Sequence, residues 1–138
     1  MEKTALIITD DSESTRKTAE SIASLLTTWK VVSITAGDFD GTQLLPADIY
    51  FFGAEKSNPP SFSYLHKMLQ HINLAGRLCG IFSASQEAAG YLRNMVRDSE
   101  LALHPDPFLG EGDIKTWTEK IVKLYTVDVI GSSDGLQS

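Results

Sequence analysis

Short apolar runs alternate along the chain with segments whose apolar residues recur every three or four positions. The runs are rich in β-branched and aromatic residues and lack the polar alternation of a strand that faces water on one side. Such runs are typical of strands that are buried on both faces of a sheet. We expect five strands, at residues 4–8, 30–34, 48–53, 77–83 and, shortest of all, 101–103.

The segments between these runs carry a helical pattern. Within residues 12–26, apolar or small residues recur at spacings of three and four, and either Asp11 or Ser12 can cap the first turn. Similar patterns predict further helices that run from Pro60 to near Asn73 or Gly76, from 88 to 96 and from 114 to 124.

Strands that alternate with helices in this way pair in parallel through right-handed crossovers. We therefore expect an α/β protein with an open, doubly wound sheet of five parallel strands between two layers of helices. Residues 1–126 have the length of one domain, and residues 127–138 are expected to form a frayed C-terminal tail. In such sheets ligands bind beyond the carboxyl ends of the strands. The loops to inspect are therefore 9–15, 36–41, 54–60, 83–90 and 104–113.

The charge and the single cysteine limit the classes of partner and compartment. The formal net charge is −6, whereas nucleic acids and anionic membranes are bound through basic patches. Neither is therefore an expected partner. No segment has the length of a membrane span or of a secretory signal, and we expect a cytoplasmic protein. Cys79 stands alone in an apolar run, which predicts a buried and unreactive thiol.

The passages around the third and fourth predicted strands carry a family resemblance. Residues 48–53 read Asp, four apolar or aromatic residues and Gly, and Leu74 and Gly76 precede the basic residue and apolar run of 77–82. In order and spacing, these passages resemble the flavodoxin family, and the resemblance extends from residue 4 to about residue 125, the length of the short-chain members. It implies a flavodoxin-like strand order 2-1-3-4-5, FMN as cofactor, and an electron carrier whose acidic surface docks a redox protein partner.

The resemblance also implies which residues would hold FMN. Flavodoxins bind the phosphate with hydroxyl and backbone N–H groups at the N-terminus of the first helix, which here are those of Ser12, Ser14 and Thr15. The loop after the third strand would border the ring edge and N5, and the loop after the fourth strand would border the pyrimidine side. The residues implied are Ala54, Glu55, Lys56, Ser57 and Asn58 in the first of these loops, and Ser83, Ala84, Ser85 and Gln86 in the second. No catalytic or metal-binding residue is implied.

The predicted phosphate loop departs from the family pattern Ser/Thr, x, Thr, Gly, Asn, Thr. Glu13 stands in place of the glycine, and Ser14 in place of the asparagine. Together with Asp10 and Asp11, Glu13 puts three carboxylates near the place of a phosphate dianion, which like charges oppose. Carboxylates also favour the N-terminus of a helix. Helix capping is therefore the alternative interpretation of this acidic cluster.

Neither predicted flavin loop contains an aromatic residue, although ring burial contributes much of the affinity for a flavin. Phe62, Tyr64 and Tyr91 lie at the edges of these loops, where their helical spacing favours core or surface positions. Asn58 tolerates unusual backbone angles and suits the backbone flip that flavodoxins use beside flavin N5. Two hypotheses stay open: an FMN-binding electron carrier, or a flavodoxin-like domain that has lost FMN and acts as a protein-binding or regulatory module.

Asp10 and Asp11 also resemble the paired acids of a response-regulator receiver, which has the same strand order and binds Mg²⁺ with them. A receiver further needs an aspartate at the end of the third strand and a lysine after the fifth. Gly53 takes the first of these positions, and residues 104–113 contain no lysine. The sequence therefore argues against a working phosphoacceptor.

Overall fold

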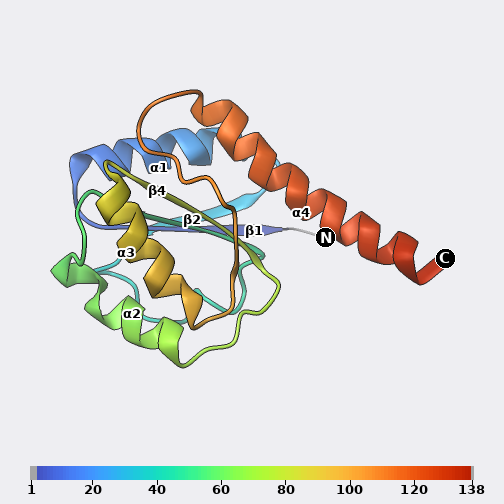
Figure 1. The fold of residues 1–138 in the computed structure, drawn as a ribbon, viewed down its shortest axis with the longest axis horizontal. Helices are drawn as coiled ribbons and strands as arrows, with labels where there is room; N and C mark the ends of the chain where they lie inside the picture. The colour runs from blue at the N-terminus through green and yellow to red at the C-terminus, as the bar shows by residue number, and fades with distance from the viewer. Residues whose placement is uncertain (1–2, 138) are drawn as a thin grey trace.

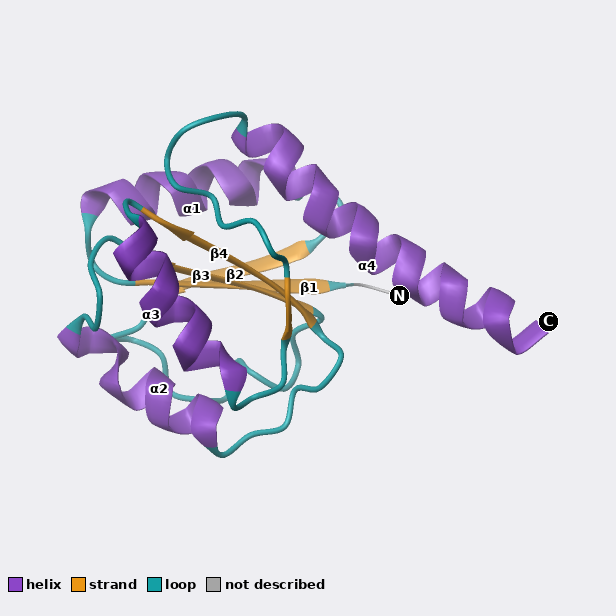
Figure 2. Ribbon diagram, in the orientation of Figure 1, coloured by secondary structure: helices purple, strands orange, loops and turns teal. Residues whose placement is uncertain are grey.

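The computed structural model describes residues 3–137, with side chains described as far as Tyr125. Its elements are distributed along the chain as Figure 2 shows. The strands are β1 (Thr4–Thr9), β2 (Lys30–Thr35), β3 (Ile49–Ala54), β4 (Leu78–Ser83) and β5 (Ala102–Leu103). The helices are α1 (Glu13–Leu25), α2 (Ser63–Gln70), α3 (Gln86–Arg97) and α4 (Ile114–Gln137), and a 3-10 turn, η1 (Pro60–Phe62), leads into α2.

The five strands form one parallel sheet in the order β2-β1-β3-β4-β5, which confirms the predicted flavodoxin-like α/β fold. β1 lies between β2 and β3, and Ile8 is paired with Ile34 on one side and with Phe52 on the other. From β1 the chain goes first to β2 on one side and then to β3 on the other side, and β4 and β5 continue in that second direction. The order of the strands therefore reverses at β1. Ligands of such sheets bind at this reversal, beyond the carboxyl ends of the strands.

The two faces of the sheet bury alternate residues of each central strand, because successive side chains of a strand point to opposite faces. Helices α2 and α3 cover one face, and α1 and α4 cover the other (Figure 1). Full burial of a large apolar side chain on either face stabilises the fold by about 1.5–3 kcal/mol. The first face buries Leu6, Ile8, Tyr50 and Phe52, and the second buries Ala5, Ile7, Ile49 and Phe51.

The connection from β2 to β3, residues 36–48, contains no helix. Its apolar side chains Phe39, Leu44 and Ala47 are buried in the same core as α2 and α3. The hydroxyl of Tyr50 lies within hydrogen-bond distance of the carbonyls of Leu44 and Ala47, which ties this loop to β3. The loop predicted over 36–41 is confirmed, and it covers the end of the sheet where a helix would otherwise lie.

The close approach of α4 to the sheet depends on a glycine. A Cβ on Gly80 of β4 would lie 2.6 Å from Cδ1 of Ile121 and 3.1 Å from Cη2 of Trp117. Any larger residue at this position would therefore push α4 away from the strand. The neighbouring Cys79 is fully buried, as predicted, and burial raises the pKa of its thiol.

Helix α2 ends earlier than the pattern predicts. α2 ends at Gln70, short of Asn73 and Gly76, and the Asn73 side chain instead accepts a 2.9 Å hydrogen bond from the N–H of Ala75. An asparagine that bonds its own following backbone favours a turn over a helix.

β5 is short because the chain leaves β4 after Leu103. Pro105 and Pro107 have no N–H to donate to the ladder. Phe108 then returns to β4: its N–H donates to Ile81 O at 3.0 Å, and its carbonyl accepts from Ser83 N at 2.9 Å.

α4 continues past residue 126, the boundary that the sequence predicts for the domain, and projects beyond the sheet (Figure 1). The side chains after Tyr125 lie outside the described part of the structure, so the division into a domain and a tail stays a prediction. Within residues 3–137, no helix is long and apolar enough to cross a membrane.

Candidate functional site

The carboxyl ends of β1 and β3 bring two predicted site loops together. The N–H of Asp10, the first residue after β1, donates to the carbonyl of Gly53 at 3.1 Å. The Asp10 side chain then turns inward and is only 5% exposed. A carboxylate buried this deeply needs hydrogen-bond donors around it.

Four donors surround the carboxylate of Asp10. Its Oδ1 accepts from the Ser12 hydroxyl at 2.7 Å, from the Ser12 N–H at 3.3 Å, and from the Thr15 hydroxyl. Its Oδ2 accepts from the N–H of Glu55 at 2.8 Å. A carboxylate can accept about four hydrogen bonds, so Asp10 is fully satisfied without any ligand.

Ser12 and Thr15 have little capacity left for another acceptor. Their hydroxyl oxygens lie 2.6 Å apart, and each also contacts Asp10 Oδ1. A hydroxyl group has a single hydrogen to donate. Both hydrogens are therefore used within this cluster of three side chains.

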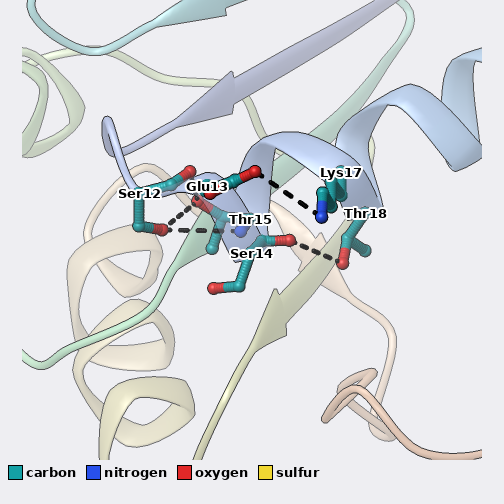
Figure 3. Close-up of polar contacts among 6 residues, drawn as sticks. All are labelled: Ser12, Glu13, Ser14, Thr15, Lys17 and Thr18. Carbon is teal, nitrogen blue, oxygen red and sulfur yellow. Dashed lines mark hydrogen bonds and ion pairs between the residues drawn. The ribbon is translucent and has the colours of Figure 1, made fainter.

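The same segment caps α1. Ser12 is the N-cap residue, and its hydroxyl oxygen accepts from the N–H of Thr15 at 3.4 Å. Glu13 lies in the first turn, where its negative charge interacts favourably with the positive end of the helix dipole. Its carboxylate also pairs with the Lys17 ammonium at 3.5 Å (Figure 3). This arrangement agrees with the capping interpretation for Ser12 and Glu13. The buried Asp10, in contrast, acts as an acceptor for the loop.

Ser14 is the predicted phosphate residue whose side chain stays free of the Asp10 cluster. It is exposed, and its carbonyl, not its hydroxyl, is engaged, by the Thr18 hydroxyl at 3.1 Å (Figure 3). Among Ser12, Ser14 and Thr15, it is therefore the one whose hydroxyl could reach a ligand without a rearrangement.

The loop after β3 is exposed except at its start. Ala54 ends β3 and is fully buried, whereas Glu55, Lys56, Ser57 and Asn58 are exposed. Asn58 has φ of 50°, in the left-handed region that asparagine tolerates. Asn58 thus adopts a backbone angle of the kind that the sequence analysis expects asparagine to tolerate.

The loop after β4 is occupied by its own hydrogen bonds. The Ser83 hydroxyl donates to the carbonyl of Ser85 at 2.7 Å. The Ser85 hydroxyl accepts from the N–H of Ala88 at 3.2 Å and so caps α3, which begins at Gln86. These contacts make Ser83 and Ser85 structural residues of the turn, and Ala84, Ser85 and Gln86 are exposed.

One pocket at this edge joins the loops after β1, β4 and β5. Its volume is about 150 Å³, and the loop 54–58 contributes no residue to its wall. Small-molecule sites usually have volumes of about 300–1,000 Å³. The wall is formed by Ser14, Thr15, Thr18, Phe82, Ser83, Ala84, Leu109 and Gly110.

The aromatic residues near the predicted flavin loops do not line this pocket. Phe62 is fully buried and packs on Tyr91, which also contacts His66. Tyr64 packs on Phe39, and its hydroxyl donates to the carbonyl of Asp40. Their positions in the core and on the surface agree with the prediction from helical spacing.

These residues do not fit FMN as the structure has them. The hydroxyls of Ser12 and Thr15 are bonded to Asp10, the pocket is smaller than small-molecule sites usually are, and the loops 54–58 and 83–86 supply no ring. The structure does bring Ser14, Thr15, Ser83 and Ala84 of the predicted set into one wall.

Sequence reasoning placed Asp10 in an acidic cluster but missed its role as the acceptor at the centre of the loop. The available signal was its position, directly after a strand that is buried on both faces. Leu109 and Gly110 were also missed, although they belong to the inspected loop 104–113. Their contribution depends on the return of Phe108 to β4, which only the folded chain reveals.

The position that a receiver would need for its phosphoacceptor is filled by a neighbouring ring. A Cβ on Gly53 would lie 2.1 Å from Cε2 of Phe82. No aspartate side chain fits there unless the ring moves. The structure thus agrees with the argument against a receiver.

No protein-family model and no curated protein sequence matches this chain. Solved flavodoxin structures do match it over most of its length. A short-chain flavodoxin associated with a PDU bacterial microcompartment has a TM-score of 0.76 and 14% identity, and the match covers 91% of this chain and 99% of that one.

Two further flavodoxins agree with this result. Flavodoxin 2 from Bacillus cereus matches with a TM-score of 0.74 and 18% identity, over 88% of this chain and 98% of that one. The flavodoxin of Streptococcus pneumoniae TIGR4 matches with a TM-score of 0.72 and 13% identity, over 87% and 97%. The described strand order and these likenesses together establish that this chain has the flavodoxin fold.

Proposed function

We propose that this chain is a flavodoxin-fold module that works through contacts with another protein and does not carry FMN as a redox group. The observation that carries this proposal is the pocket at the carboxyl edge of the sheet. At about 150 Å³, it is smaller than the range of about 300–1,000 Å³ that is usual for small-molecule sites. The only ring in its wall, Phe82, is 1% exposed and belongs to the core.

The same edge offers a charged surface for a partner. Every segment that follows a strand, counted to the first turn of the next helix, carries at least one exposed carboxylate. Lys56 is the only exposed cation on the loops of these segments, and Arg16 and Lys115 follow in the first turns of α1 and α4. Hydrogen bonds from Thr42 and Thr116 hold the pKa values of Asp40 and Asp113 below their usual range, so both stay ionised. The exposed carboxylates of this acidic edge are Asp11, Glu13, Asp38, Asp40, Glu55, Glu87, Asp106, Glu111 and Asp113. A basic protein surface is the complementary partner.

Titration with FMN tests the first half of this proposal. The fluorescence of FMN should stay unchanged as the purified chain is added, and the purified chain should be colourless. The flavodoxin of Fusobacterium nucleatum, whose structure is known with bound FMN, serves as the positive control. Quenching of FMN at a ratio of one to one would overturn the proposal.

Charge removal tests the second half. If a partner binds the acidic edge, its binding should be lost in the triple variant Asp11→Asn, Glu55→Gln, Glu87→Gln. Raised salt should weaken the binding in the same way. It should be retained by the matched variant Glu20→Gln, Asp98→Asn, Glu119→Gln, which removes three exposed carboxylates elsewhere. Equal losses in the two variants would show that the acidic edge is not the docking surface.

The second candidate function is an FMN-binding electron carrier that docks a redox protein on the acidic edge. The left-handed backbone of Asn58 and the free hydroxyl of Ser14 favour it. Under this proposal Ser12, Ser14 and Thr15 would bind the phosphate, which requires Ser12 and Thr15 to leave Asp10. The FMN titration decides between the two candidates, because a bound flavin supports only the second.

A further inference from the structure

We infer that Asp10 is an internal substitute for a ligand phosphate, and that its carboxylate keeps phosphate monoesters out of the loop between β1 and α1. This inference rests on the proposed function, because it explains why the loop holds no cofactor phosphate. It concerns one side chain, whereas the proposed function concerns the whole edge of the sheet.

The first argument is that Asp10 already holds the donors that an anion would need. Two hydroxyls, those of Ser12 and Thr15, and two backbone N–H groups, those of Ser12 and Glu55, donate to its carboxylate. Hydrogen bonds to an ionised acceptor are shorter and stronger than those between neutral groups. A phosphate would have to displace a bonded, buried carboxylate to reach the same donors.

The second argument is electrostatic. A phosphate monoester carries a charge of about −1.5 to −2 at pH 7, and it would lie beside the carboxylate of Asp10 in a site with little water to screen the repulsion. Two cations follow in α1, Arg16 and Lys17, and both are exposed. Lys17 is paired with Glu13, so its charge is already partly offset.

The third argument is that Asp10 links two loops through one side chain. Oδ1 holds Ser12 and Thr15 after β1, and Oδ2 holds the N–H of Glu55 after β3. Concave loops of this kind can bind an anion through their donors. Here the Asp10 carboxylate is itself an anion that bonds both loops.

The test replaces Asp10 by Ser, which removes the charge and opens the centre of the loop, and by Asn, which removes the charge but keeps an oxygen acceptor. The matched control is Asp11→Asn, which removes the neighbouring exposed carboxylate. Each protein is heated in inorganic phosphate and in potassium chloride of equal ionic strength, and each is titrated with FMN and with riboflavin, which lacks the phosphate.

The expected result is a rise in the unfolding midpoint of Asp10→Ser in phosphate relative to chloride, with no rise in the parent chain or in Asp11→Asn. Affinity for FMN should increase about tenfold or more in Asp10→Ser, as for a gained charge-assisted contact, while affinity for riboflavin stays unchanged. Without phosphate, both Asp10 variants should unfold at a lower temperature than the parent.

Two results would overturn the inference. One is a folded Asp10→Ser protein that gains no affinity for phosphate, and the other is an equal gain in Asp11→Asn, which would indicate general charge repulsion. If Asp10→Ser does not fold, Asp10→Asn decides by the same criteria. Binding of FMN by the parent chain would refute the proposed function, whereas the absence of any gain in the variants refutes this inference alone.

Discussion

Phe82 lies against the backbone of Gly53, so that a Cβ on Gly53 would come within 2.1 Å of the ring atom Cε2. The two residues are paired neighbours on β4 and β3, and the ring is 1% exposed. The ring therefore fills the space of the side chain that Gly53 lacks. This pairing closes the floor of the small pocket at the carboxyl edge, to which Phe82 contributes.

Gly53→Ala should destabilise the fold, because its new methyl group overlaps the buried ring of Phe82. Overpacking of this kind costs about 1–3 kcal/mol. Urea unfolding of the variant measures the loss. Gly37→Ala is the control, because nothing lies within 4 Å of a Cβ at that exposed position, and its stability should change by less than about 0.5 kcal/mol.

A second substitution shows whether the ring is the cause of that loss. Gly53→Ala should cost less when combined with Phe82→Leu than it does alone, and the double-mutant cycle should give a coupling of about 0.5–3 kcal/mol. Additive losses would mean that the backbone of β3, and not the ring, resists the methyl group.

Arg77→Ala should loosen the loop between β2 and β3. Its Nη1 donates to the carbonyls of Leu45 and Ala47 at 2.8 and 3.0 Å and to the Tyr50 hydroxyl at 2.9 Å. Hydrogen bonds from a charged donor contribute about 1.5–3 kcal/mol, which is the loss expected in urea unfolding. Arg93→Ala, on an exposed face of α3, should be nearly neutral, and equal losses in the two variants would contradict this role for Arg77.

Ser85→Ala should lower stability by about 1 kcal/mol, because it removes the N-cap of α3. Its hydroxyl accepts from the N–H of Ala88 at 3.2 Å. Ser57→Ala, in the exposed loop after β3, is the control and should unfold as the parent does. Unchanged stability of Ser85→Ala would leave its hydroxyl available for a role in ligand binding.

Cys79 should make the fold sensitive to alkaline pH. Burial raises the pKa of the folded thiol above its ordinary value of 9.0, so the unfolded chain releases its proton at a lower pH than the folded chain does. The contribution to stability is therefore complete below pH 9 and is lost as the pH rises above it, at about 1.4 kcal/mol per pH unit.

Urea unfolding of the parent and of Cys79→Ala measures this effect. The difference in stability between them should shrink by about 1.4 kcal/mol between about pH 8 and about pH 10. Tyr50, whose pKa is also raised by burial, is present in both proteins and cancels from the comparison. A difference that is independent of pH would mean that the thiol reaches water in the folded chain.

The amino-acid sequence was sufficient for the fold because burial on both faces leaves a local pattern. The runs that became β1 and β3 are apolar or aromatic except at their ends, and each predicted strand lies within about a residue of the observed one. Helix ends were less predictable, as α2 shows. Its end depends on a turn at Asn73 that competes with one more helical turn.

The candidate site could be predicted only in outline. The loops were correctly placed, because the carboxyl ends of parallel strands meet at one edge, and the hydroxyls of Ser12 and Thr15 lie at the start of α1 as expected. What these hydroxyls bind was not evident. Asp10 and Glu55 are 45 residues apart in the chain, and no local pattern reveals a bond over that separation.

By itself, the sequence determined the parallel sheet, its two buried faces and the edge at which ligands of such sheets bind, because these follow from the spacing of apolar residues along the chain. The strand order came from the resemblance to flavodoxins and not from that spacing. Only the tertiary structure decided what occupies that edge. Contacts between the ends of β1, β3 and β4 decide whether Asp10 points to solvent or into the loop. They also decide how much room the loops leave for a flavin. Such contacts exist only once the strands are paired.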